Sequence, residues 1–137
     1  MKTSNLVEAY TLGTYLNPPI RSFELALNSE IFIDKSGLIK ETNKYINTLQ
    51  RYMCVSRPRR FGKSMAMDML AAYYRRNINT EQLFQNLKIN QDESYKKHLN
   101  QYDVIKIDMQ EFLSATHCVD DMIKEINHEI VKEFLTA

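Results

Sequence analysis

One stretch constrains this chain more than any other: residues 55–64 read V-S-R-P-R-R-F-G-K-S. The run 52–56 just before the arginines is mostly apolar, which is typical of a buried strand. Residues 63–76 are rich in Met, Ala and Leu, which favours a helix. A strand, a loop with a glycine near its end, and a helix are together the parts of a phosphate-binding loop.

The chemistry of such a loop depends on its last residues, which here are Gly62, Lys63 and Ser64. The glycine lets the backbone approach a phosphate because it has no Cβ. The first N–H groups of the helix point at the anion. The lysine reaches the outer phosphates, and the serine hydroxyl binds Mg²⁺. G-K-S alone is a weak signal, but the strand and helix on either side favour a nucleotide site over a structural turn.

Arg57 stands where such a loop usually carries its first glycine, five residues before Gly62. Pro58 biases Arg57 towards an extended backbone, so the loop is expected to be stiffer than the usual form. Arg57, Arg59 and Arg60 place three positive charges around the loop. These arginines either hold phosphate or face solvent, and the residues alone leave both interpretations open.

The rest of the chain predicts further helices and one further strand. From apolar spacing and capping residues, we expect helices over residues 23–29, 38–49, 63–76, 81–86 and 119–135. Residues 104–108 form the second strand candidate. This order of elements predicts an α/β fold with a mostly parallel sheet and flanking helices. The strands 52–56 and 104–108 are expected to be neighbours or near neighbours, joined by a right-handed crossover through the helix that starts at Lys63.

Composition narrows the class of protein. A chain of 137 residues with 44% hydrophobic residues suits one domain with a core. The net charge of +1 gives no global electrostatic case for nucleic acid or a membrane as partner. No stretch is apolar enough for a signal peptide or a membrane span. Cys54 and Cys118 lack a C-x-x-C spacing and fit a reducing compartment, so we expect a cytoplasmic protein.

Four stretches are similar to one known family. They are I-F-I-D-K-S-G-L-I at 31–39, S-R-P-R-R-F-G-K-S-M at 56–65, L-F-Q-N-L-K-I at 83–89 and Y-D-V-I-K-I-D at 102–108. Over about residues 18–130 the chain resembles the AAA-ATPase-like family of P-loop proteins, and the R-P-R-R-F-G-K-S match is very specific. Arginine at the first-glycine position is that family's own variant, so Arg57 is not a sign of a damaged loop.

The resemblance implies a P-loop ATPase core that binds ATP and Mg²⁺. It also implies that a restriction-endonuclease-like nuclease domain often follows, which would bring nucleic acid in as a partner. Nucleotide-binding roles are carried over to Arg57, Arg59, Arg60, Phe61, Gly62, Lys63, Ser64, Asp34 and Lys35, with Ser64 as the magnesium ligand. Asp34 and Lys35 match the family's D-K pair, which we place near the adenine or the ribose. The alternative for this pair is a turn and a helix cap.

A P-loop ATPase also needs an acidic strand that orients Mg²⁺ and the attacking water. In the family this strand lies beyond the region that resembles the present chain. Asp108 is the substitute candidate for a catalytic acid, although Lys106 breaks the apolar run before it. We therefore divide the chain into an irregular segment, 1–20, and the N-terminal part of a P-loop ATPase-like domain, 21–137. We expect this chain alone to bind nucleotide without hydrolysing it.

A second interpretation belongs to a different class of protein. In it the chain is a non-catalytic interaction module whose arginine-rich loop contacts an acidic partner or a nucleic-acid backbone. Backbone N–H groups of residues 59–64 that converge on one point would favour the nucleotide site. In either case an incomplete sheet would leave an open edge, and such edges recruit other chains. We therefore also expect self-association.

Overall fold

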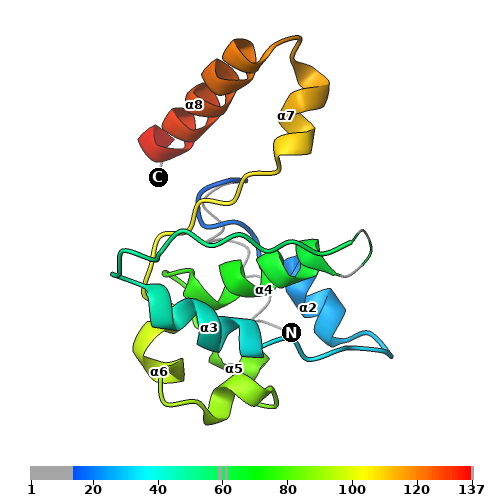
Figure 1. Ribbon diagram of the computed structural model, residues 1–137, viewed down its shortest axis with the longest axis vertical. Coiled ribbons are helices and arrows are strands. Elements are labelled where there is room, and N and C mark those ends of the chain that lie inside the picture. Colours follow the sequence, from blue (N-terminus) through cyan, green and yellow to red (C-terminus); the bar gives the residue numbers. More distant parts are fainter. Residues whose placement is uncertain (1–13, 59, 61, 137) are drawn as a thin grey trace. The chain divides into compact units, whose positions relative to one another are not determined.

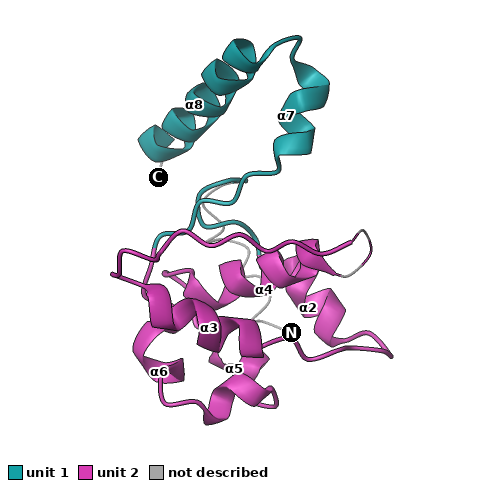
Figure 2. Ribbon diagram, in the orientation of Figure 1, with its two compact units in different colours: residues 1–19, 103–137 teal, residues 20–102 magenta. Residues whose placement is uncertain are grey.

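The computed structural model describes residues 14–58, 60 and 62–136. Figure 1 shows helices joined by extended segments in this part of the chain. The helices are α2 (Arg21–Leu27), α3 (Gly37–Tyr45), α4 (Lys63–Tyr74), α5 (Glu81–Phe84), η1 (Lys88–Gln91), α6 (Tyr95–His98), α7 (Met109–Ala115) and α8 (Val119–Thr136). The chain divides into two compact units, residues 20–102 and residues 1–19 with 103–137 (Figure 2).

The predicted α/β fold with a mostly parallel sheet is wrong for the described residues, in which no strand forms. Pairing is limited there to two isolated bridges, an antiparallel one between Leu16 and Ile105 and a parallel one between Arg75 and Tyr102. The expected crossover between strands 52–56 and 104–108 is therefore also wrong. A strand is stable only when a neighbouring strand takes up its N–H and C=O groups. Residues 51–58 are instead extended and exposed.

The predicted helices are confirmed, with some shifted ends. The helix after the loop begins at Lys63 as expected and ends at Tyr74, two residues early. The helix predicted over 38–49 runs from Gly37 to Tyr45. The long helix predicted over 119–135 is α8, whereas α7, which precedes it, was not predicted. Helix propensity and apolar spacing act locally, so they carry over to the structure without a sheet.

Aromatic side chains form the core of unit 2, the residues 20–102. Phe23 of α2 stacks on Phe84 of α5, with ring centroids 5.3 Å apart. Tyr73 of α4 meets Phe84 edge-on at 5.6 Å, and its hydroxyl donates a hydrogen bond of 2.7 Å to the carbonyl of Tyr95 in α6. Each of these four rings is almost fully buried. Burying such rings supplies much of the stability of a small unit, and here it fixes α4 against its neighbours.

The C-terminal end of α4 is closed by Asn100, which has a left-handed backbone with φ of 56°. Its side-chain amide donates to the carbonyl of Arg75 at 2.8 Å and to the hydroxyl of Thr80 at 2.9 Å. The Thr80 hydroxyl in turn donates to the carbonyl of Ala72, at 2.9 Å. Carbonyl groups in the last turn of a helix have no partner within the helix, and these two side chains supply one.

The described part of unit 1 consists of residues 14–19 and 103–136. Its core is small and consists of Tyr15, Phe112 of α7 and Met122 of α8, with Ile107 and Ile126 packed against them. The carboxylate of Glu133, on α8, accepts hydrogen bonds from the backbone N–H groups of Thr14, Tyr15 and Leu16 at 2.7 to 3.2 Å.

Across the described residues of both units, none of the helices combines the length and the apolar character that a bilayer crossing requires.

Candidate functional site

The loop predicted to bind phosphate ends at the first residue of α4. Gly62 precedes the helix with φ of 77° and ψ of 30°, a left-handed conformation that favours glycine. Its carbonyl accepts the hydrogen bond of the Ala66 N–H at 2.9 Å. The first N–H groups of α4 have no partner within the helix, and Gly62, the N-cap residue, has no side chain to cap them. The helix therefore presents backbone donors and the positive end of its dipole at this point.

Arg60 also has a positive φ, of 68°, which is uncommon for a residue with a side chain. Arg59 and Phe61, which were predicted to bind nucleotide, lie outside the described residues. Convergence of the N–H groups of residues 59–64 on one point, which would favour the nucleotide site, involves these two residues and therefore stays a prediction.

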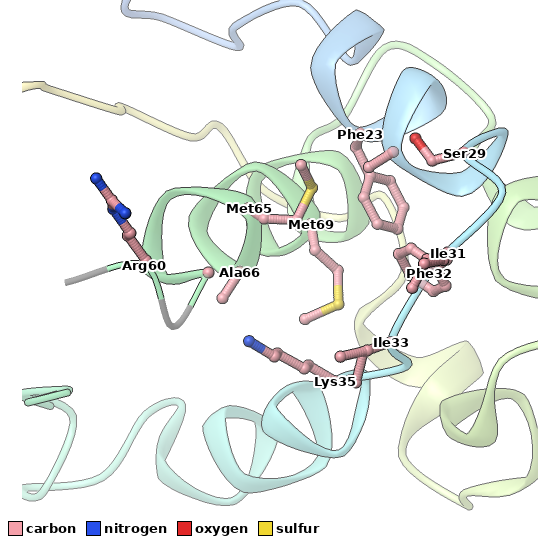
Figure 3. Close-up of a pocket in the computed structure, with 12 residues that line it drawn as sticks. Phe23, Ser29, Ile31, Phe32, Ile33, Lys35, Arg60, Met65, Ala66 and Met69 are labelled. Carbon is pink, nitrogen blue, oxygen red and sulfur yellow. The ribbon is translucent and has the colours of Figure 1, made fainter. Parts of the chain in front are cut away.

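A cavity of about 550 Å³ opens beside this loop (Figure 3). One part of its lining is apolar and comes from α2, from the segment before α3 and from α4: Phe23, Ala26, Ile31, Phe32, Ile33, Met65, Ala66 and Met69. The polar part consists of Ser29, Lys35, Arg60 and Gly62. A largely apolar hollow with a few polar groups is the usual form of a small-molecule site.

Lys35 reaches across this cavity to the loop. A Cβ built on Gly62 would lie 2.7 Å from the Lys35 ammonium nitrogen, a distance too short for two unbonded atoms. Figure 3 shows the nitrogen of Lys35 directed towards the first turn of α4. The left-handed backbone is what favours glycine at position 62, and the flexible end of Lys35 lies over it.

Asp34 takes part in the turn before α3. Its carboxylate accepts from the backbone N–H groups of Ser36 and Lys88, each at 2.8 Å. Burial acts to raise the pKa of Asp34, but the hydrogen bonds from Ser36 and Lys88 outweigh it, so the pKa is lowered overall. Asp34 does not line the cavity described above. These contacts are those of the turn alternative, and a contact of Asp34 with a base or ribose stays a prediction.

The other predicted site residues lie apart from the cavity lining. Lys63 and Ser64 occupy the first turn of α4 and are exposed, and Arg57 is exposed in the extended segment before the loop. Asp108 belongs to unit 1, where it caps α7 by accepting the N–H of Gln110 at 3.0 Å. Its role as a catalytic acid stays a prediction. The described residues contain no group of three His, Cys, Asp or Glu side chains placed to hold a metal.

The sequence reasoning missed the apolar wall of the cavity. Ile31 and Ile33 were named only within the stretch 31–39 that resembles the family, yet their side chains are 83% and 70% exposed and line the same hollow as Phe23 and Met65. The sequence signal for this wall is the pair of isoleucines directly before the charged residues Asp34 and Lys35. Apolar residues that are exposed together often mark a ligand or partner site.

Comparison with known proteins gives one result. No curated protein and no solved structure matches the chain. The model of one family, described as predicted AAA-ATPase, matches residues 19–137. That match covers both the loop and the cavity, and it extends over most of the sequence. The chain therefore belongs to the AAA-ATPase-like family.

Proposed function

We propose that this chain binds ATP with Mg²⁺, with the phosphates held at the loop 57–64 and the N-terminus of α4. The observation that carries the proposal is the cavity of about 550 Å³, which has Gly62 and two cationic side chains in its lining beside the start of a helix. Backbone donors at a helix N-terminus favour anions. Family membership supports a nucleotide over other anions.

The proposal assigns a role to each part of the site. Lys63 meets the outer phosphates, and Ser64 contributes a ligand to the Mg²⁺ that arrives with the nucleotide. The apolar wall of the cavity, formed by residues such as Phe23 and Met65, receives the base.

Exposed free cysteines, Cys54 and Cys118, support a reducing compartment, and we therefore propose that the protein is cytoplasmic.

The test is the thermal stability of the chain with and without Mg·ATP. A ligand that binds only the folded state stabilises it by about 2.7 kcal/mol at a hundred times its Kd. We expect a clear rise in Tm for the wild type, and we expect Lys63→Ala to remove most of it because the charge that meets the phosphates is lost. Lys124→Ala, an exposed lysine on α8 in the other unit, is the matched control and should keep the full rise.

The same measurement separates this proposal from the interaction-module interpretation. If the arginine-rich loop serves an acidic partner, wild type and Lys63→Ala respond identically to millimolar Mg·ATP, and the nucleotide proposal fails. A duplex oligonucleotide that binds the chain without competition from ATP would then favour the interaction module. Arg57→Ala should weaken that oligonucleotide binding, because phosphate contacts by exposed arginines supply its affinity.

A further inference from the structure

We propose that Lys35 supplies a second phosphate-binding ammonium group to this site, from a segment that precedes the loop in the sequence. The inference rests on the proposed nucleotide function and extends it. It assigns Lys35 to the phosphates, whereas the sequence had placed the residue near the base or the ribose. The position of its ammonium nitrogen, 2.7 Å from a Cβ built on Gly62, carries the assignment.

The backbone around Lys35 is fixed on both sides. Asp34 accepts the N–H of Lys88 at 2.8 Å, and the hydroxyl of buried Ser36 accepts the N–H of Ile89 at 3.1 Å. The carbonyl of Lys35 accepts the N–H of Leu38 at 3.0 Å and so opens α3. Lys35 therefore projects from a turn whose backbone is held at three points, and this fixes the position from which its long side chain reaches the cavity.

The charges at this end of the cavity favour an anion there. Lys35 and Arg60 both line the cavity, and Lys63 follows Gly62 directly. The N-terminus of α4 adds the positive end of a helix dipole, next to which a cation is destabilised. Bound phosphate removes the repulsion and replaces it with attraction at short range.

The geometry also separates phosphate from base. The ammonium group of Lys35 lies at Gly62, which is the residue where α4 begins and where backbone donors are available. The apolar wall that suits a base is formed by other residues, among them Phe23 and Met69. Lys35 therefore has its charge at the phosphate end of the cavity.

The experiment measures the affinities of the chain for Mg·ATP, inorganic triphosphate and adenosine by calorimetry. We compare wild type with Lys35→Met, which removes the charge and keeps an apolar stem of similar length. A charge-assisted contact is worth enough to change affinity about tenfold. We expect Lys35→Met to weaken ATP and triphosphate by the same factor and to leave adenosine unchanged. Lys35→Arg should recover most of the lost affinity.

Two controls keep the result interpretable. Lys44→Met changes an exposed lysine of α3, the helix that follows Lys35, where it pairs with Glu41 on the surface, and should alter no affinity. Thermal unfolding without ligand checks that Lys35→Met is folded. The ratio of ATP affinity to adenosine affinity does not depend on the folded fraction, so it decides the question even for a less stable variant. Lys35→Gln repeats the loss of charge with a polar side chain.

The outcomes distinguish the two proposals. If the wild type binds ATP, Lys63→Ala loses it and Lys35→Met does not, the assignment of Lys35 is overturned and the nucleotide site stands. A loss of ATP affinity without a loss of triphosphate affinity also overturns it, because Lys35 then acts on the base or ribose. If the wild type binds neither ATP nor triphosphate, both proposals are wrong.

Discussion

Asp34 shows how one residue of a short motif holds a turn without lining the cavity. Its two hydrogen bonds, from Ser36 and Lys88, tie the turn before α3 to the segment that begins η1. The neighbouring residue, Lys35, is the one that lines the cavity. The motif thus combines a residue that holds the turn with a residue that reaches the site, and only the contacts tell them apart.

The lowered pKa of Asp34 predicts a pH dependence of stability. Its hydrogen bonds hold the ionised form, against the effect of burial, so the pKa in the folded state lies below the ordinary value of about 3.9. The contribution of the carboxylate is complete above that ordinary value and is lost as the pH falls through the folded-state pKa. We expect Asp34→Asn to be less stable than wild type at pH 7, and the gap to close in acid.

Urea unfolding between pH 7 and pH 2 measures that gap. Other carboxylates titrate in both proteins, so their effects cancel in the difference between wild type and Asp34→Asn. A difference that stays constant over the whole range would show that the ionised carboxylate of Asp34 does not stabilise the turn.

At the scale of the element, α4 carries the site at one end and is held at the other. Asn100 and Thr80 close its C-terminal end, and Tyr73, in the last turn, anchors that end in the aromatic core. Because a helix is stiff over this length, these contacts also fix the direction of its first turn. Gly62 and the cavity depend on that direction, although they lie a helix length away.

We expect Asn100→Ala to destabilise unit 2 by about 1–3 kcal/mol, since it leaves carbonyls at the end of α4 without their donor. Asn100→Gly is the matched variant, because glycine accepts the left-handed backbone and lacks only the amide. If the hydrogen bonds dominate, both variants lose similar stability in urea unfolding. If Asn100→Gly is as stable as wild type, the residue serves the backbone conformation alone.

The helices of this chain could be predicted from the sequence, whereas its extended segments could not. The composition of residues 63–76 favours a helix in any surroundings, and α4 forms there. The runs 52–56 and 104–108 look equally apolar, but a strand is defined by its partner. Lys106 and Val104 find backbone partners at Tyr15 and Asn17, whereas residues 51–58 remain extended without forming a ladder.

The candidate site was predicted in part for the same reason. Gly62 and Lys63 could be found because a loop motif is local in sequence. The cavity joins Phe23, Lys35 and Met69, which are far apart in sequence, and spacing alone does not reveal that they meet. The short helix α7 was missed because Asp108, which caps its N-terminus, had been assigned to the end of the predicted strand 104–108.

On the scale of the whole molecule, the most conspicuous surface is the extended run before the loop. Tyr52 is 82% exposed, and Met53 and Val55 are each about two-fifths exposed. An exposed apolar segment that belongs to no helix or strand is a site where another chain can pair with the backbone as a strand. The charged residues Arg51 and Arg57 flank it and limit this tendency, because like charges repel.

We expect the chain to associate as its concentration rises, through residues 52–55. Sedimentation at several concentrations measures this, and the double variant Tyr52→Lys with Val55→Lys should shift the equilibrium towards the monomer. Leu49→Lys is the control, since Leu49 is 92% exposed but lies outside the run. If Leu49→Lys has the same effect, association is due to general apolar exposure. A monomer at every concentration would contradict the expectation altogether.

The hydrogen bonds of Glu133 have a consequence for the order in which the molecule can form. They join Tyr15 to Glu133, which lies 118 positions later in the sequence. Unit 1 therefore cannot be completed on the ribosome before residue 133 has been synthesised. Unit 2, residues 20–102, is available earlier and as one continuous segment. Closing a loop costs more entropy as the loop lengthens. If residues 20–102 fold first, the flexible loop that must be closed between the two parts of unit 1 is shorter. Unit 2, which carries the candidate site, can therefore fold first during synthesis. The two segments of unit 1 that flank it in the sequence pair with each other last.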